Sequence, residues 1–173
     1  MPKSDSEIGT RGAGGVSLRT VRFRMPGGWR RDVTDHPGPT AVTLPADIRA
    51  AMIEHARAEY PNEMCGVVVG DAYAAAGGRP LRWEPARNAE ASPMRYSVHP
   101  EDLLRLTIET DDADEVFWAI AHSHVRSPAA PSLTDIGVAQ YPDALYILVS
   151  LSDDDVRAWR IVGGAIHEVA ISE

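Results

Sequence analysis

The chain has 173 residues, of which 44% are hydrophobic and 24% are charged, as in an ordinary globular protein. This length accommodates one domain with a real hydrophobic core but is short for two. The formal net charge is −8, although residues 1–31 carry seven basic and two acidic residues while the remainder carries ten and twenty-three. An acidic body argues against nucleic acid as the main partner, and the basic segment is expected to be a solvated tail.

Membrane and redox features point to one compartment. No run of about eighteen apolar residues occurs, so no membrane span is expected. The N-terminus lacks the apolar core of a secretory signal. Cys65 is the only cysteine, which excludes an intrachain disulfide and fits a reducing environment. We therefore expect a cytoplasmic protein with no membrane contact.

The first part of the chain differs in composition from the rest. Residues 1–15 are rich in glycine, serine and charge and are expected to be mobile. Apolar and basic residues alternate over 21–25, which is compatible with a short strand, and glycine- and proline-rich stretches follow. The sequence therefore predicts a basic, partly disordered N-terminal extension over residues 1–38 and a folded domain over 39–173.

The start of this domain predicts a helix. Pro45 suits the first turn of a helix. Ile48, Met52 and Ala56 then fall on one face, as in a helix that packs on a core. The helix must end before Pro61, because the residue before a proline is biased away from helical backbone angles.

The rest of the domain mixes strands and helices. Apolar and β-branched runs predict strands, and two acids after a proline favour a helix. The predicted strands cover residues 64–70, 80–86, 94–98, 116–124, 144–151, 156–162 and 165–171, the last two as a hairpin, and the predicted helices cover 99–109 and 132–141. Without strict βαβ alternation, this order predicts an α+β fold with a curved mixed sheet packed between helices.

Polar residues cluster at the end of the predicted strand 116–124. Side chains at positions i and i+2 of a strand point to the same side, so His122 and His124 project together while Ser123 faces away. Zinc takes imidazole nitrogens at about 2.0–2.1 Å, and two histidines on one side can share one ion. We therefore expect His122 and His124 to be metal ligands.

Ser132 and Asp135 open the short helix that follows. Ser-x-x-Asp before an apolar helix is typical of an N-cap, which is a structural role. The two roles are compatible, because a helix start is a rigid platform that can hold an aspartate toward a metal. Two histidines and Asp135 would give zinc three ligands and leave a fourth position open to water, whose pKa then falls from ~15.7 toward ~7. Ser132 could hydrogen-bond the oxyanion that forms at a substrate carbonyl.

Such a site also needs a proton acceptor, and Glu63 is the candidate. It directly precedes the buried strand predicted over 64–70. A glutamate at such a position is usually a surface turn residue, but one that faces inward is anchored on a rigid element. Cys65, two residues later, is better explained as a buried core thiol than as a nucleophile, because an apolar run surrounds it and no base suited to activating a thiol lies near it in the sequence.

The five candidate residues together resemble the motif of the JAMM (MPN+) metallopeptidases. They are Glu63, His122, His124, Ser132 and Asp135. The family pattern is an upstream glutamate followed by His-x-His-x7-Ser-x2-Asp, and every spacing is intact here. The resemblance implies the JAMM/MPN fold, which is cytidine-deaminase-like, and zinc-dependent hydrolysis of a peptide or isopeptide bond. By this resemblance the two histidines and the aspartate bind zinc, the glutamate is the general acid/base, and the serine stabilises the tetrahedral intermediate.

Residues 55–70, 87–98 and 141–153 carry a closer resemblance, to small bacterial members that act on ubiquitin-like sulfur-carrier proteins. It implies hydrolysis of the amide bond after the carrier's C-terminal Gly-Gly, with release of cysteine, in cysteine biosynthesis or a related sulfur transfer. The resemblance covers about residues 40–173 and leaves the N-terminal segment without a counterpart.

Two other functions stay open: an isopeptidase that removes ubiquitin-like modifiers from lysines, and a metal-free scaffold that binds ubiquitin-like partners. Only residues 137–142 separate the short helix from the next strand, whereas members that cleave ubiquitin chains carry a long insertion there, so a small leaving group is favoured. The predicted strand 94–98 is one candidate edge for a Gly-Gly tail. We expect three polar residues to be solvated at the surface or to contact either the carrier or the carboxylate of the released amino acid. They are Arg87, Asn88 and Arg95. The sequence leaves the oligomeric state open.

Overall fold

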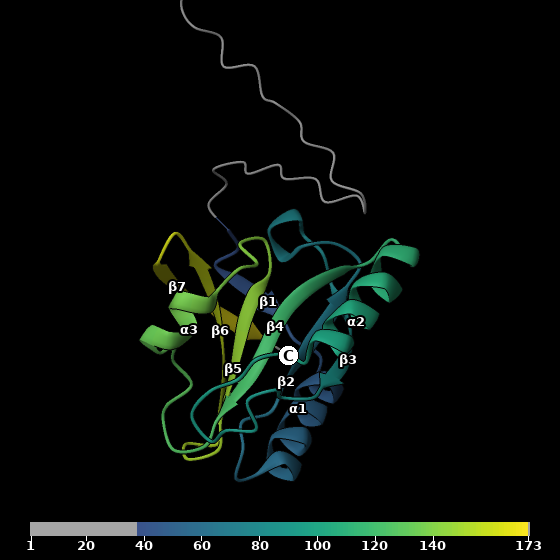
Figure 1. The fold of residues 1–173 in the computed structure, drawn as a ribbon. Coiled ribbons are helices and arrows are strands. Elements are labelled where there is room, and N and C mark those ends of the chain that lie inside the picture. Colours follow the sequence, from purple (N-terminus) through teal and green to yellow (C-terminus); the bar gives the residue numbers. More distant parts are fainter. Residues whose placement is uncertain (1–37, 173) are drawn as a thin grey trace, which may run out of the picture. The chain divides into compact units, whose positions relative to one another are not determined.

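The computed structural model describes residues 38–172, and the short strand considered over 21–25 lies outside them. Within this part of the chain, seven strands form one mixed sheet in the order β1-β7-β6-β5-β4-β2-β3 (Figure 1). The β1–β7 and β4–β5 pairs are parallel and the others antiparallel. The strands are β1 (Ala41–Thr43), β2 (Cys65–Gly70), β3 (Pro80–Ala86), β4 (Val116–His124), β5 (Leu145–Ser150), β6 (Asp155–Val162) and β7 (Ala165–Ser172).

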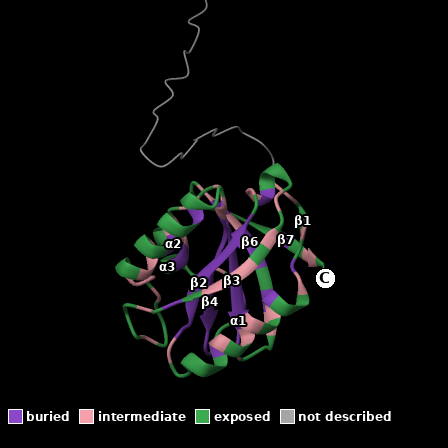
Figure 2. Ribbon diagram, turned by 90° about the vertical axis from the view of Figure 1, so that its right-hand side faces the viewer, coloured by how far each residue is buried: buried purple, intermediate pink, exposed green. Residues whose placement is uncertain are grey.

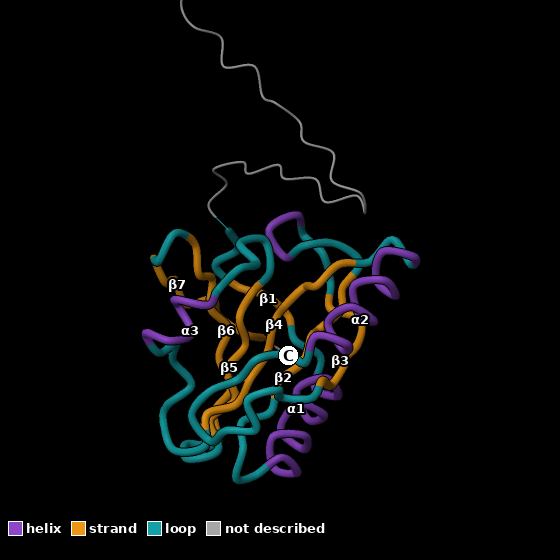
Figure 3. The backbone as a smooth tube through the Cα atoms, viewed as in Figure 1, coloured by secondary structure: helices purple, strands orange, loops and turns teal. Residues whose placement is uncertain are grey.

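Helices cover both faces of this sheet, which confirms the predicted α+β fold. α1 (Ala46–Glu59) packs on one face, while α2 (Pro100–Asp112) and α3 (Leu133–Val138) lie on the opposite face (Figure 2). A single 3-10 turn, η1 (Ala74–Ala76), connects β2 to β3 (Figure 3). None of the helices within residues 38–172 combines the length and apolar character that a membrane crossing requires.

The sheet divides the hydrophobic core into two clusters. On the α1 side, Ile48, Met52 and Ala56 are buried at the helical spacing that the sequence predicted. On the other side, Leu106 of α2 belongs to a cluster with Phe117 of β4. Every residue of β2 and β5 is buried, which explains why these segments are continuous apolar runs instead of alternating patterns.

Strand β4 lies inside the sheet and ends with the two histidines of the motif. It pairs antiparallel with β2, where His122 is opposite Cys65, and parallel with β5, where His122 is opposite Leu148 and His124 is opposite Ser150. Because pairing on both edges fixes the strand backbone, the end of β4 is a rigid base for polar side chains.

The helices and strands predicted for the described residues are confirmed with one exception. Segment 94–98 is not a strand, and its one ladder contact is the isolated bridge between Val98 and Asn88. The Asn88 side chain binds this backbone instead, donating to Arg95 O and accepting from the N–H of Ser97. Side-chain capture thus replaces the strand pairing that the residue types favoured. Sequence reasoning also missed β1, which is only three residues long.

The C-terminal hairpin turns at Gly163 and Gly164. Their φ angles of 58° and 84° are the left-handed values that a tight two-residue hairpin turn requires. The predicted Gly-Gly hairpin is therefore confirmed, and β6 and β7 pair antiparallel across it.

Candidate metal centre

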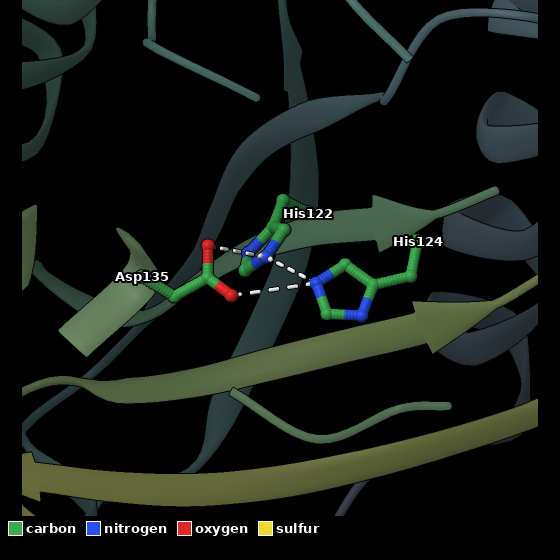
Figure 4. Close-up of side chains that lie close together, drawn as sticks. All are labelled: His122, His124 and Asp135. Carbon is green, nitrogen blue, oxygen red and sulfur yellow. Dashed lines mark hydrogen bonds and ion pairs between the residues drawn. The ribbon is translucent and has the colours of Figure 1, made fainter. Parts of the chain in front are cut away.

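Two histidines and an aspartate from separate elements meet beside the end of β4 (Figure 4). His122 and His124 come from the end of β4, and Asp135 comes from the first turn of α3. The two histidine Nε2 atoms are 3.3 Å apart. Asp135 Oδ1 lies 3.3 Å from Nε2 of His122, and Oδ2 lies 3.4 Å from Nε2 of His124. All three residues are buried. The short distances between them show that the three residues singled out in the sequence converge in the fold.

These separations fit a single tetrahedral zinc ion. With zinc–ligand distances of about 2.0–2.1 Å, adjacent ligand atoms of a tetrahedron lie roughly 3.3–3.4 Å apart. The two Nε2 atoms are 3.3 Å apart, the length of one such edge, and each of them lies 3.3 or 3.4 Å from one oxygen of the Asp135 carboxylate, Oδ1 for His122 and Oδ2 for His124. The candidate ligand group found within residues 38–172 has three members. Such a set leaves one corner of the tetrahedron for water or substrate.

Contacts behind the two imidazole rings set their orientation. Nδ1 of His124 lies 2.8 Å from Pro128 O, so this nitrogen donates its proton, and in the neutral ring Nε2 then carries the lone pair that a metal ion would take. His122 is fully buried and stacks on Tyr96, with ring centroids 4.0 Å apart and planes inclined by 18°. Nδ1 of His122 has no hydrogen-bond partner among the described residues. Stacking on Tyr96 therefore holds the plane of the His122 ring, whereas a hydrogen bond from Nδ1 holds the His124 ring.

The start of α3 places Asp135 through a capping box. Ser132 Oγ accepts the backbone N–H of Asp135 at 3.2 Å, and Asp135 Oδ2 accepts the backbone N–H of Ser132 at 2.7 Å. One carboxylate thus caps the helix and faces both histidines, so the predicted N-cap and the candidate ligand position coexist. Because the cap uses a lone pair of Ser132 Oγ, the hydroxyl hydrogen of this exposed residue stays available for a substrate oxygen.

The charges of the cluster follow from burial and from these hydrogen bonds. Burial alone would raise the pKa of Asp135, but hydrogen bonds to His122 and His124 outweigh it and hold that pKa well below its usual range. Burial lowers the pKa of His122. Burial would also lower the pKa of His124, but its hydrogen bonds to Asp135 and to the Pro128 carbonyl raise it. A cation that binds Nε2 of His124 must therefore compete with a proton up to a higher pH than at an ordinary histidine.

Glu63 lies just before β2 and is buried close to the cluster. Burial raises the pKa of Glu63 to about 7; the charge of His124 lowers this pKa and that of Asp135 raises it further. Its backbone N–H donates to Ser92 O at 2.8 Å, and its carbonyl accepts from Asn88 Nδ2 at 2.9 Å. Its carboxylate has no hydrogen-bond partner in the described part of the chain. The backbone of Glu63 is therefore held in place, and its carboxylate stays available to a water molecule.

Two residues of the segment before α2 support this arrangement, and sequence reasoning assigned neither to it. Tyr96 stacks on a histidine of the cluster. Asn88, expected at the surface or at a substrate, uses its side chain for four hydrogen bonds to backbone atoms, one of them to Glu63. Arg87, considered with it, binds Asp102 at 2.9 Å. The available signal was an asparagine that opens a turn-rich stretch, where side-chain capture of backbone is common.

Cys65 is the buried thiol that the sequence predicted. It is fully buried, and its Sγ lies 3.7 Å from Ala86 O and 3.5 Å from Arg87 O. Burial raises the pKa of this thiol to about 12, so the nucleophilic thiolate is suppressed.

A family model described as prokaryotic homologs of the JAB domain, Prok-JAB, matches residues 45–162. The chain belongs to the Prok-JAB family. The matched span runs from the start of α1 to the end of β6 and contains all five residues of the motif. The resemblance to JAMM (MPN+) proteins is therefore confirmed at the level of the family and the fold.

Two characterised relatives cover most of this Prok-JAB chain. The CysO-cysteine peptidase of Mycobacterium tuberculosis is 40% identical over 134 residues, which are 76% of this chain and 90% of the relative. The desampylase of Haloferax volcanii is 29% identical over 136 residues, which are 76% of this chain and 95% of the relative.

Two solved structures resemble the fold of this chain. A solution structure of a protein from Desulfitobacterium hafniense superposes with a TM-score of 0.66 at 27% identity, covering 75% of this chain and 90% of that one. A second, from Salinibacter ruber, has a TM-score of 0.53 at 24% identity and covers 76% and 91% of the two chains.

Proposed function

We propose that this chain is a zinc-dependent peptidase that hydrolyses the amide bond after the C-terminal Gly-Gly of a ubiquitin-like sulfur-carrier protein and releases cysteine. The observation that carries the proposal is that two imidazole nitrogens and one carboxylate converge at separations of 3.3–3.4 Å, as the ligands of one zinc ion do, with the buried Glu63 carboxyl nearby. The substrate class is supported by the relative named as a CysO-cysteine peptidase. On this proposal the protein acts in the cytoplasm in cysteine biosynthesis or a related sulfur transfer.

Each motif residue has a role in this reaction that its surroundings support. His122, His124 and Asp135 hold the zinc, whose chemistry when bound is to polarise a carbonyl and to lower the pKa of water. Glu63 accepts a proton from the attacking water on its carboxylate and delivers that proton to the departing amine nitrogen. Ser132 donates its hydroxyl hydrogen to the oxygen that becomes negative as the carbonyl is attacked.

The connection after α3 favours a small leaving group. The helix ends at Val138 and β5 begins at Leu145, so only residues 139–144 connect them. A connection this short offers little surface to hold a folded protein on the leaving-group side. An amino acid such as cysteine needs no such surface.

The CysO–cysteine adduct, the substrate named in the mycobacterial relative, provides the test. The wild-type protein should release free cysteine from it, as measured by mass spectrometry of the carrier and a thiol assay. Glu63→Gln keeps the size of the side chain but removes the proton acceptor, so cysteine release should fall by roughly 100-fold or more while zinc stays bound. Unchanged release by Glu63→Gln would refute the assigned base.

A second candidate activity is removal of ubiquitin-like modifiers from lysines, which the desampylase relative favours. An isopeptide between the same carrier and a lysine peptide separates the two activities. The proposal requires a higher kcat/KM for the cysteine adduct. A higher kcat/KM for the lysine conjugate would assign the chain to the second activity.

A metal-free scaffold is the remaining alternative, and zinc content decides it. The protein should contain one zinc per chain when purified without chelator, as measured by elemental analysis. Substitution of His122 by Ala should remove that zinc. Absence of zinc from the wild-type protein would favour the scaffold.

A further inference from the structure

We propose that the edge of the metal centre is a docking surface for an acidic face of the carrier protein, formed by Met94, Arg95, Arg126 and Leu133. These four residues are called the site rim below. The inference rests on the proposed function and adds the chemistry by which the body of the carrier, as distinct from its tail, is held. Its basis is that Arg95 and Arg126 have no ion-pair partner within residues 38–172 and that the side chains of Met94 and Leu133 are exposed.

Positive charge without a partner occurs at the site rim. Residues 38–172 contain ten arginines, no lysine and twenty acidic residues. Eight of these arginines take part in an ion pair or another interaction, and they are Arg49, Arg57, Arg79, Arg82, Arg87, Arg105, Arg157 and Arg160. The side chains of Arg95 and Arg126 are exposed and have no hydrogen bond or ion pair within residues 38–172. An acidic partner can therefore pair with them without breaking an existing contact.

Hydrogen bonds place Arg95 beside the proposed base. Its carbonyl accepts from Asn88 Nδ2 at 3.0 Å, and the same amide nitrogen donates to Glu63 O at 2.9 Å. The next residue, Tyr96, stacks on His122. The backbone of Arg95 is thus held between the base and a proposed zinc ligand.

Arg126 lies in the segment that connects β4 to α3, between the two histidines and Asp135 in the sequence. It follows His124 by two residues and precedes Pro128, whose carbonyl binds the His124 ring. The neighbouring Ser127 carbonyl accepts from Ser150 Oγ at 2.9 Å, which ties this segment to the end of β5. Both unpaired arginines therefore belong to segments that are anchored at the site.

Two nearly fully exposed apolar side chains accompany them. Met94 is 81% exposed and Leu133 is 89% exposed, the highest values among the exposed large hydrophobic residues of the described chain. Met94 directly precedes Arg95, and Leu133 directly follows Ser132 of the motif. Exposed apolar groups next to unpaired charge are a common feature of protein interfaces.

The charge balance selects the kind of partner. Acidic residues outnumber arginines two to one over residues 38–172, so most of this surface repels an anionic partner. A compact protein with an acidic cluster near its C-terminal tail can reach the site rim and avoid the rest. A flexible Gly-Gly tail then enters the centre while the folded body pairs with the two arginines.

Binding of the CysO protein, measured by fluorescence anisotropy with labelled carrier, tests this inference without relying on catalysis. The double variant Arg95→Glu/Arg126→Glu should raise the Kd by roughly 10-fold or more, and the double variant with lysines should bind within about 3-fold of wild type. Salt should weaken binding of the wild type more than binding of the glutamate variant. Arg57→Glu is the matched control, because this arginine lies on α1, on the opposite face of the sheet.

Cleavage gives a second readout. The glutamate variant should lose at least about 10-fold more kcat/KM on the CysO–cysteine adduct than on a short peptide ending in Gly-Gly-Cys, mainly through KM. Equal losses on both substrates, wild-type Kd in the glutamate variant, or carrier-independent dimerisation that the glutamate variant abolishes would overturn the inference. Failure of the wild type to bind CysO would also overturn it. Binding that depends on the arginines, without any cysteine release, would instead refute the proposed function and leave the docking surface supported.

Discussion

At the scale of single residues, Asp135 connects the fold to the metal centre. Its carboxylate caps the Ser132 backbone at 2.7 Å and lies 3.3 and 3.4 Å from the two histidine Nε2 atoms. The sequence predicted both roles of Asp135. The Ser-x-x-Asp pattern predicted the helix cap, and the spacing from the two histidines predicted a metal ligand. The sequence could not predict the stacking of Tyr96 on His122, because that contact joins a loop to a strand.

The Tyr96 ring should matter for metal binding through its shape. Tyr96→Leu removes the stacking that fixes His122, so the zinc Kd should rise by roughly 2- to 10-fold, as expected for the loss of one aromatic pair. Tyr96→Phe keeps the ring and should bind zinc like the wild type. Competition with a chromophoric chelator measures both variants. Equal weakening in both would assign the effect to the hydroxyl group.

The buried Glu63 carboxyl should give peptidase activity an acid limb. Burial raises its pKa from 4.5 to about 7, and a dication bound nearby would lower it from there. A base works only when deprotonated, so kcat/KM should fall as pH decreases, with a midpoint at or below about 7. A pH–rate profile measures this limb. A kcat/KM that rises on acidification through this range would contradict the assignment.

At the scale of elements, the helices and strands with a periodic or continuous apolar pattern were predictable, and the loop at residues 94–98 was not. The apolar runs of β2, β4 and β5 are buried strands, as continuous apolar sequence indicates for the inside of a sheet. Segment 94–98 has strand-forming residue types, but the Asn88 side chain binds its backbone, and its pairing is limited to the isolated bridge at Val98. The outcome depended on one side chain's hydrogen bonds, which residue propensities do not report. β1 was missed because three residues carry no periodic signal.

Removing the Asn88 amide should therefore disturb both the loop and the base. Asn88→Ala leaves backbone groups without partners and should lower the free energy of unfolding by about 1–3 kcal/mol, measured by urea denaturation. It should also lower kcat, because Glu63 and Tyr96 lose their common support. Ser97→Ala is the control, since it keeps the backbone N–H that donates to Asn88. Unfolding and kcat equal to those of the control would contradict this role.

At the scale of the whole molecule, an interior sheet strand carries the candidate centre. The candidate ligands converge from β4 and α3, elements that the sheet and the core hold in place, so the folded chain should bind metal and gain stability from it. A ligand that binds only the folded state at 100 times its Kd adds about 2.7 kcal/mol. Zinc should therefore raise Tm and chelator should lower it, as measured by scanning calorimetry. A Tm insensitive to zinc in the wild type would contradict this coupling.

Lower pH should weaken zinc binding across the whole centre. Hydrogen bonds raise the pKa of His124 despite its burial, so protons compete with the cation over a range that begins above the ordinary histidine value. The zinc Kd, measured by competition between pH 5.5 and 8, should rise as pH falls. A Kd independent of pH over this range would argue against histidine ligation.

Anomalous diffraction at the zinc absorption edge, from crystals grown with one equivalent of zinc, tests the central claim most directly. We predict one anomalous peak per chain, at about 2.0–2.2 Å from Nε2 of His122, Nε2 of His124 and one carboxylate oxygen of Asp135, with a non-protein ligand in the fourth position. A zinc peak elsewhere, or none at these three side chains, would contradict the account of this chain as a zinc peptidase.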